Sequence, residues 1–218
     1  MKLVLRLALL SLVLLYSSCS SAPPELSYFE IYPVRVFLPS SGNYHYELFA
    51  VANVFSEGGL KSLSELYIVH DSKQLYWVSR QEEWDPVDIH GEHWIGVGGL
   101  IAGDMDSPVG TYRAILVDVA GAQVERTYTV PSVPRSRGLQ PEIEVGDAFF
   151  EIDSVHGRHR VMVESASGEL LYEEETEETR FTADDFALND SDVFRVTVST
   201  AQPKSGYLFR TGPVEIRL

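Results

Sequence analysis

The sequence predicts an all-β protein, with two β-sandwiches in tandem behind a cleaved N-terminal export signal. Three observations support this. A short apolar run lies near the N-terminus, apolar residues then recur at every second position over many short segments, and a proline-bounded stretch interrupts that alternation once. The 200 residues left after the signal suit one large or two small domains.

The N-terminal residues 1–18 have the composition of an export signal. Lys2 and Arg6 precede an almost unbroken apolar run over residues 7–15. That run is far shorter than the roughly 20 residues a membrane-spanning helix needs, so it fits the apolar region of a cleaved signal better than an anchor.

Cys19, which is the sole cysteine of the chain, follows this run directly. The segment Tyr16-Ser17-Ser18-Cys19 resembles the lipobox of bacterial lipoproteins, although Tyr16 stands where that family prefers an aliphatic residue. The resemblance implies cleavage before Cys19, a diacylglycerol on its thiol and an acyl group on its amine. The small residues Ser17 and Ser18 also fit ordinary secretory cleavage, so secretion or periplasmic release is the alternative.

Residues 19–25 then form a short lipidated tether. Two or more acyl chains hold a protein stably at a membrane surface, so the expected membrane contact is the lipid itself. Ser20 is not acidic, and by analogy with enteric-type lipoproteins this favours the outer over the inner membrane of a bacterial envelope. With Cys19 modified, the folded part contains no disulfide.

The charge of the chain limits its partners. The formal net charge is −15, and loss of Lys2 and Arg6 with the signal changes it to −17. Such an acidic body argues against nucleic acid as a partner and against electrostatic adhesion to anionic lipid.

The first sandwich is expected over residues 26–131. In residues 44–55 the alternation places Leu48 and Ala50 on one face, while His45, Glu47 and Asn53 share the other. Pro33 suggests an edge strand or a bulge, and Gly121 suits a hairpin turn. Further strands are expected at 32–39, 65–70, 74–79, 93–101, 110–119 and 123–130, with about one helical turn between residues 79 and 88.

Residues 132–141 contain prolines and a glycine, and their apolar residues show no regular spacing. We expect these residues to be the linker between the two sandwiches.

The second sandwich is expected over residues 142–218. The like-charged run at 173–180 reads as a solvated face that keeps an edge strand from pairing with a neighbour. Its strands are expected at 141–145, 148–153, 159–165, 168–174, 179–182, 193–200 and 212–218.

Two resemblances refine the sandwich class. The pattern of strands and hairpins over residues 142–218 is similar to the later half of a fibronectin type III domain, with Phe194 where many members have a tyrosine. The stretch around Gly110 and Tyr112 resembles the start of strand F in bacterial immunoglobulin-like domains. That resemblance implies that the Tyr112 hydroxyl bonds back to nearby backbone; the alternative is an ordinary core aromatic.

Candidate binding residues concentrate in the first sandwich. Trp77, Trp84 and Trp94 lie between its middle strands, and an exposed indole there would stack on a sugar or anchor a protein partner. The alternative, which is commoner for a residue such as Trp84, is that the indole plugs the end of the sandwich.

His90 and His93 are the best metal-like pair, but they lack the further ligands that complete a zinc site, and a solvated loop explains them. The sequence contains no G-x-S-x-G motif and no glycine-rich phosphate loop, so we expect no catalytic residues and no cofactor.

The sequence as a whole predicts a lipid-anchored envelope protein with a non-catalytic binding or assembly role. Its expected partner is an envelope protein or a glycan. Carbohydrate or peptidoglycan binding through the three tryptophans is the main alternative, and a metal protein or enzyme a further one.

Overall fold

A computed structural model describes residues 22–101, 107–132, 139–146, 149–155, 157–186, 193–202 and 207–217. The predicted signal, Cys19 and most of the predicted linker lie outside these residues. In the described part the chain folds into strands joined by turns and short 3-10 helices, which confirms the all-β prediction. No helix in that part is long and apolar enough to cross a membrane.

The strands lie close to the predicted segments. In chain order they are β1 (Glu25–Leu38), β2 (Asn43–Phe55), β3 (Leu63–His70), β4 (Leu75–Arg80), β5 (Asp85–Ile89), β6 (Glu92–Ile101), β7 (Gly110–Asp118), β8 (Gln123–Val130), β9 (Glu142–Val145), β10 (Phe150–Asp153), β11 (His159–Ser165), β12 (Leu170–Thr176), β13 (Arg180–Phe181), β14 (Val193–Gln202) and β15 (Tyr207–Arg217). The 3-10 helices are η1 (Leu60–Ser62), η2 (Asp71–Lys73), η3 (Gln81–Glu83) and η4 (Ala183–Phe186).

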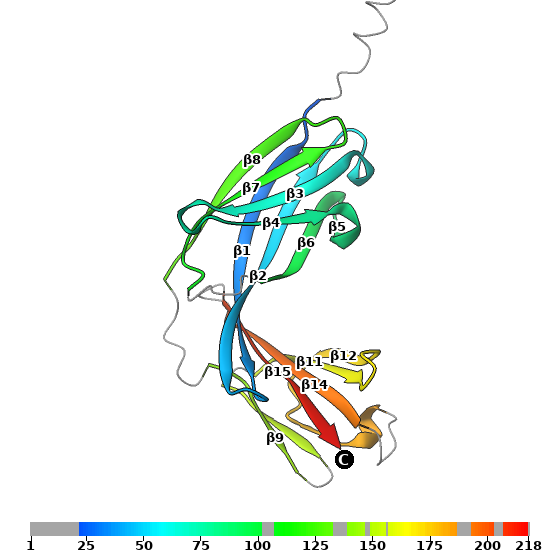
Figure 1. The fold of residues 1–218 in the computed structure, drawn as a ribbon. Helices are drawn as coiled ribbons and strands as arrows, with labels where there is room; N and C mark the ends of the chain where they lie inside the picture. The colour runs from blue at the N-terminus through cyan, green and yellow to red at the C-terminus, as the bar shows by residue number, and fades with distance from the viewer. Residues whose placement is uncertain are drawn as a thin grey trace, which may run out of the picture.

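One large sheet runs through the whole molecule (Figure 1). Its eight strands have the order β12-β11-β14-β15-β1-β2-β6-β5, and two smaller sheets have the orders β4-β3-β7-β8 and β13-β10-β9. Strands from both sides of the predicted linker therefore belong to a single sheet. The sheet order does not follow the predicted division into two separate sandwiches.

The two halves meet where β1 pairs with β15. This pairing is parallel and runs from Val34 opposite Leu208 to Phe37 opposite Thr211, whereas the neighbouring pairs β1–β2 and β14–β15 are antiparallel. Pro33 precedes the first β1–β15 pair. The earlier residues of β1 pair only with β2, which fits the edge position expected for a proline that has no N–H to donate.

Each end of the large sheet has one face covered by a smaller sheet. Beneath β4-β3-β7-β8 the buried residues include Ile31, Leu48 and Tyr112, and beneath β13-β10-β9 they include Phe150 and Val196. Tyr207 and Phe209 of β15, at the far end of the sequence, pack into the first of these cores. The last strand thus contributes to the core that the first half of the chain builds.

The end of the predicted linker packs on the same covered side. Leu139 packs against the first core, and the Gln140 amide donates to the Arg210 carbonyl oxygen and to Thr211 Oγ1. The Thr211 hydroxyl in turn donates to the Pro141 carbonyl oxygen. These bonds hold the start of the second half against β15.

Several local predictions are confirmed. Gly121 has φ of 86° in the β7–β8 hairpin, and its turn is closed by Asp118, whose Oδ1 accepts from the Ala120 and Ala122 amides. The fully buried Tyr112 donates its hydroxyl to the Pro108 carbonyl oxygen at 2.8 Å, as the corner resemblance implies. The strongly acidic β12 lies at the edge of the large sheet.

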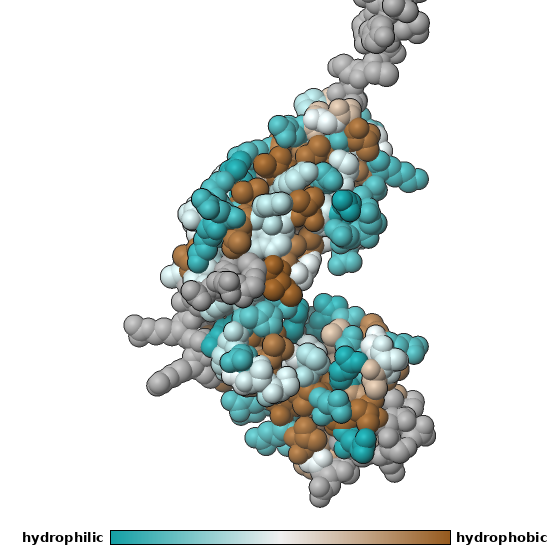
Figure 2. Space-filling model, in the orientation of Figure 1, coloured by the Kyte–Doolittle hydropathy of each residue, from teal (hydrophilic) through white to brown (hydrophobic). Residues whose placement is uncertain are grey.

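The outer face of the four-stranded sheet is partly apolar. Figure 2 shows hydrophobic side chains, in brown, among polar ones over the upper half of the molecule. Tyr76 is exposed on β4, and its cross-strand neighbour Val69 is partly exposed on β3. The ion pairs of Arg113 with Asp71 and Glu125 border this surface.

Candidate functional site

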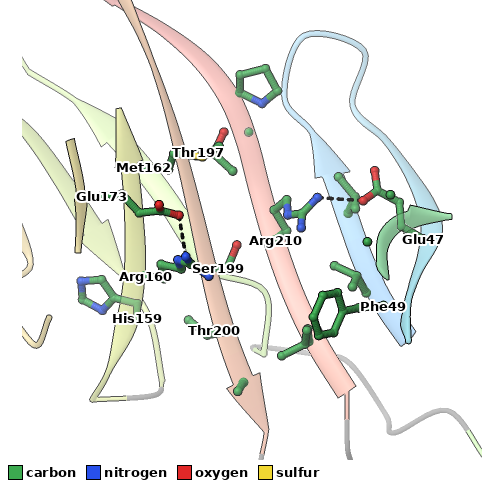
Figure 3. Close-up of a pocket in the computed structure, with 18 of the residues that line it drawn as sticks. Glu47, Phe49, His159, Arg160, Met162, Glu173, Thr197, Ser199, Thr200 and Arg210 are labelled. Atoms are coloured by element: carbon green, nitrogen blue, oxygen red, sulfur yellow. Dashed lines mark hydrogen bonds and ion pairs between the residues drawn. The ribbon is translucent and has the colours of Figure 1, made fainter. Parts of the chain in front are cut away.

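A cavity among the described residues lies on the uncovered face of the large sheet. Its volume is about 750 Å³, within the range of small-ligand sites. The lining residues come from both halves of the chain: β1, β2 and β6 on one side, and β11, β12, β14 and β15 on the other (Figure 3). We call this space the junction cavity.

The register of the strands places a row of side chains across the floor of the junction cavity. Arg160 pairs with Ser199, Ser199 with Arg210, Arg210 with Val36, and Val36 with His45. Because directly paired residues point to the same face of a sheet, all five side chains project on the uncovered side. Ser199 therefore lies between two arginines, one on each neighbouring strand.

A buried carboxylate holds the first arginine. Glu47 is only 9% exposed, and its Oε2 accepts from Arg210 Nη1 at 2.7 Å. The other carboxylate oxygen of Glu47 lies 3.1 Å from His45 Nε2. A carboxylate removed from water needs such partners, and Glu47 in return fixes the direction of the guanidinium.

The second arginine is paired at the opposite wall. Arg160 Nη2 lies 2.7 Å from Glu173 Oε1, and the Arg158 guanidinium lies 3.8 Å from Glu175. In Figure 3 Arg160 extends toward Glu173 and Arg210 toward Glu47, so the two ion pairs diverge from the strand that carries Ser199. Arg160 is largely exposed, so this pair is weakened by solvent.

Apolar side chains line the cavity between these pairs. Val34 and Val36 of β1 are buried, Leu208 of β15 is the cross-strand partner of Val34, and Met162 of β11 lines the other side of the cavity. At the β6 end, Phe49 packs on glycines: a Cβ at Gly96 or Gly98 would lie 3.1 Å or 3.3 Å from its ring. The floor thus combines apolar contact area with a few placed polar groups, which is typical of binding sites.

Aromatic side chains continue along the same face beyond the junction cavity. Tyr28, 38% exposed, has its ring 5.3 Å from that of Trp94. The hydroxyls of Tyr28, Tyr32 and Tyr128 all donate to the carboxylate of Glu30. We call Tyr28, Tyr32, Phe49 and Trp94 the aromatic strip.

The carboxylate of Glu30 keeps these phenols protonated. The hydrogen bond to Glu30 and burial raise the pKa of Tyr28, and burial together with Glu30 raises the pKa of Tyr128 to about 12. Ionising either phenol would place a second negative charge beside the first.

The floor row of the junction cavity does not bring a serine and a histidine together. Ser199 and His45 are the hydroxyl and the imidazole of the floor row, and three strand spacings separate them. At roughly 4.8 Å per spacing they lie about 14 Å apart. Activation of a serine by a histidine needs hydrogen-bond contact, so this pair is not arranged for acyl transfer.

The structure separates the three predicted tryptophans. Trp84 is only 6% exposed and packs in the first core, as the commoner alternative of an indole that plugs the sandwich predicts; the exposed position that a ligand-binding role needs is not found for it. The physical reason is the turn η3 followed by the edge strand β5, which was not predicted; together they direct the ring inward. Trp77 packs against the same core and donates from Nε1 to the Ile101 carbonyl oxygen.

Trp94 alone of the three lies on the uncovered face. Its ring packs at a tilt against that of Tyr28 and remains partly exposed, and its buried Nε1 makes no hydrogen bond among the described residues. A ligand-binding role for the three indoles stays a prediction. Only Trp94 has the position for it.

The predicted histidine pair occupies a hairpin. His90 has φ of 55° in the exposed turn between β5 and β6, and His93 lies on β6. Among the described residues, no group of three or more His, Cys, Asp or Glu side chains is arranged to hold a metal ion.

Sequence reasoning did not find Arg160, Arg210 and Ser199. It placed His45 and Glu47 on the polar face of their strand, which is where they lie. The available signal was the alternation itself, but alternation does not distinguish a cavity wall from a solvated face.

Comparison with known proteins gives no family. Neither a family model nor a curated protein matches the chain. Dimeric latent PorU from Porphyromonas gingivalis is similar over 89% of this chain and 20% of its own, with 11% identity and a TM-score of 0.36. Murine CEACAM1b is similar over 87% of this chain and 98% of its own, with 10% identity and a TM-score of 0.23. The chain spans about a fifth of the length of the PorU chain.

Proposed function

We propose that the chain is a lipid-anchored protein of the bacterial cell envelope with a non-catalytic binding role, and that the junction cavity is its ligand site. The observation that carries the binding role is the cavity itself: charged and apolar side chains from both halves of the chain converge on the uncovered face of one sheet. We also propose two immunoglobulin-like or fibronectin-like units that share this sheet.

The junction cavity lies well separated along β1 from the proposed lipid anchor. The tether ends where β1 begins, at Glu25, and Val34 of the cavity lies nine residues further along the same strand. At about 3.3 Å per residue this is roughly 30 Å. A lipid at Cys19 would therefore hold the cavity away from the membrane surface. A ligand in the periplasm or at the cell surface could reach the cavity in that position.

A non-catalytic role is supported by how the charges of the cavity are used. Glu47 is occupied by Arg210 and His45, and Ser199 lies far from any imidazole of the floor row. These groups are placed to hold a ligand. Placement of the anchor in the outer membrane is part of the proposal and is supported by the residue Ser20.

The anchor has a direct test. Cys19→Ala is expected to abolish incorporation of labelled palmitate and to leave unprocessed or soluble protein, because the thiol that receives the lipid is gone. Ser20→Ala, which changes the next residue and keeps the thiol, serves as the matched control and should label as wild type. Unchanged labelling of Cys19→Ala would refute the lipid anchor.

A further inference from the structure

The outer face of the four-stranded sheet β4-β3-β7-β8 breaks the usual pattern of an antiparallel sheet that is covered on one side. In such a sheet the inward residues are apolar and the outward residues are polar. β8 follows this pattern, with Gln123, Glu125 and Thr127 outward. The outward residues of the other three strands are mostly apolar, and we call six of them the outer patch: Tyr76 and Val78 on β4, Tyr67 and Val69 on β3, and Ile115 and Val117 on β7.

The outer patch is contiguous because its members are cross-strand partners. Tyr67 pairs with Val78 on one side and with Ile115 on the other, and Val69 pairs with Tyr76 in the next row. Tyr76 is 70% exposed and Val78 is 37% exposed, and the other four residues are partly exposed. Figure 2 shows hydrophobic side chains gathered over the strands of this sheet. Single exposed apolar residues are ordinary, whereas a contiguous group on one face marks an interaction site.

The shape of the outer patch favours another flat surface as its partner. The patch lies on a sheet face, whereas small molecules bind in concave sites. Two sheet faces pack about 10 Å apart with their strands nearly aligned, and their side chains interdigitate. Four strands at about 4.8 Å spacing and eight residues at about 3.4 Å each give a face of roughly 19 by 27 Å. A face of this size is at the lower end of specific protein interfaces, so we expect weak and reversible association.

The charges around the outer patch favour a second copy of this chain. At one end of the strands Arg80 lies 3.8 Å from Glu65, and at the other end Arg113 bonds Asp71 and Glu125. The rim therefore carries both signs of charge in contact with each other, while the chain as a whole has a formal net charge of −15. Two acidic molecules repel each other least where both present paired charges around an apolar centre. A basic partner would instead be attracted to the acidic edge strand β12.

We propose that the outer patch is a homodimer interface, in which the four-stranded sheets of two copies pack face to face. Dimers of identical chains are commonly two-fold symmetric, so each copy uses the same surface. An axis along the strands, between β3 and β7, places β3 of each copy over β7 of the other and brings Tyr67 to Ile115. It also keeps the start of β1 of both copies at one end, which suits two chains anchored in one membrane (Figure 1). This interface is separate from the junction cavity, which lies on the large sheet.

The test in solution uses the full mature chain, residues 19–218, with Cys19→Ala so that neither lipid nor thiol contributes to association. Sedimentation equilibrium is expected to show monomer and dimer in exchange, with a Kd in the micromolar range, as the modest size of the face implies. Association should tighten as salt is added, because salt screens the repulsion between the two acidic molecules. A chain that stays monomeric at millimolar concentration at every salt concentration would overturn the proposal.

Charged substitutions locate the interface. Tyr76→Lys and Val78→Lys are each expected to weaken the dimer about tenfold or more, because each would bury a charge without a partner. Both side chains are exposed in the single chain, so its far-UV circular dichroism should not change. Val145→Lys is the matched control: Val145 is 49% exposed on β9 of the other small sheet, and the variant adds the same charge but should leave the dimer intact. A dimer that withstands both β4 variants uses another surface and contradicts the proposal.

Crosslinking in intact cells separates a second copy from other partners. The photo-crosslinking residue benzoylphenylalanine, in place of Tyr76 in the anchored chain, is expected to give a product of twice the chain mass that contains only this chain by mass spectrometry. A product with a different protein would overturn the second copy and assign the outer patch to that protein. The anchor is decided independently by palmitate labelling of Cys19→Ala, so failure of the dimer is distinguishable from failure of the proposed function.

Discussion

At the scale of single residues, Gly212 shows how closely the strands approach beside the junction cavity. Its φ is 117°, and a Cβ there would lie 2.5 Å from the Val196 carbonyl oxygen. Both the backbone conformation and the close contact exclude a side chain. Gly212 lies in the register shift between β14 and β15, where one residue of β14, between Val196 and Val198, faces two residues of β15, so this irregularity is tied to a glycine.

Gly212→Ala is expected to lower the free energy of unfolding by about 2–4 kcal/mol, since it combines the positive-φ penalty with a steric clash. The urea midpoint measures this. Gly168→Ala separates the two causes, because Gly168 has φ of 88° but open space at its Cβ, and it should cost about 1 kcal/mol. Equal costs for the two variants would show that the contact with Val196 does not matter.

At the scale of elements, an ion-pair network joins η2, β7 and β8. Arg113 Nε and Nη2 donate to the two carboxylate oxygens of Asp71 at 2.6 and 2.8 Å, and Nη1 donates to Glu125 at 2.9 Å. The hydrogen bonds from Arg113 hold the pKa of Asp71 below its ordinary value of 3.8. A carboxyl with a lowered folded-state pKa stabilises the fold above its unfolded pKa, and that contribution is lost as the pH falls.

Asp71→Asn is therefore expected to lower the urea midpoint at pH 7 and to have progressively less effect as the pH is taken below about 4. The effect is small because the pair is exposed to solvent. Arg113→Gln should show the same pH dependence, and the double variant should add little to either single one. A deficit of Asp71→Asn that persists unchanged in acid would contradict this account of the ion pair.

At the scale of the whole molecule, the shared sheet links the two halves. β15 begins in the first core with Tyr207 and Phe209, pairs with β1 in the middle, and ends in the second core with Ile216. One strand thus belongs to both cores. The two ends of the described chain, at β1 and β15, lie at opposite ends of the molecule (Figure 1).

Phe209→Ala tests this linkage. Phe209 is fully buried in the cluster that contains Trp84, so truncation should cost about 3–5 kcal/mol and shift the tryptophan fluorescence transition. Far-UV circular dichroism should shift by the same amount, because both halves unfold together. A fluorescence midpoint equal to that of wild type would show that the first half is stable without this residue of the last strand.

The sequence predicted many elements well where the signal is local. The alternation gave the strands Gln123–Val130 and His159–Ser165 at their observed bounds, and Gly121 marked its hairpin. It missed β5 and the Tyr207–Thr211 part of β15. Residues 208–211 pair with β1, more than 170 positions earlier, and no local pattern reports a partner that far away.

The candidate site was predictable only in part. Asn53, His45 and Glu47 were placed on the polar face of their strand, but Arg160 and Arg210 resembled any solvent-facing arginines until the sheet brought them to either side of Ser199. For Trp84 the polar loop around it left both an exposed and a plugging indole open, and the structure shows the plugging one, with the ring in the first core.

By itself the sequence determined that the chain forms strands, where most of them lie and which side chains share a face, because a strand alternates its side chains with a period of two residues. The tertiary structure decided which strands are neighbours. The parallel pairing of β1 with β15 joined the halves into one sheet and created the junction cavity. Pairing depends on the packing of residues distant in the chain, and alternation carries no information about that.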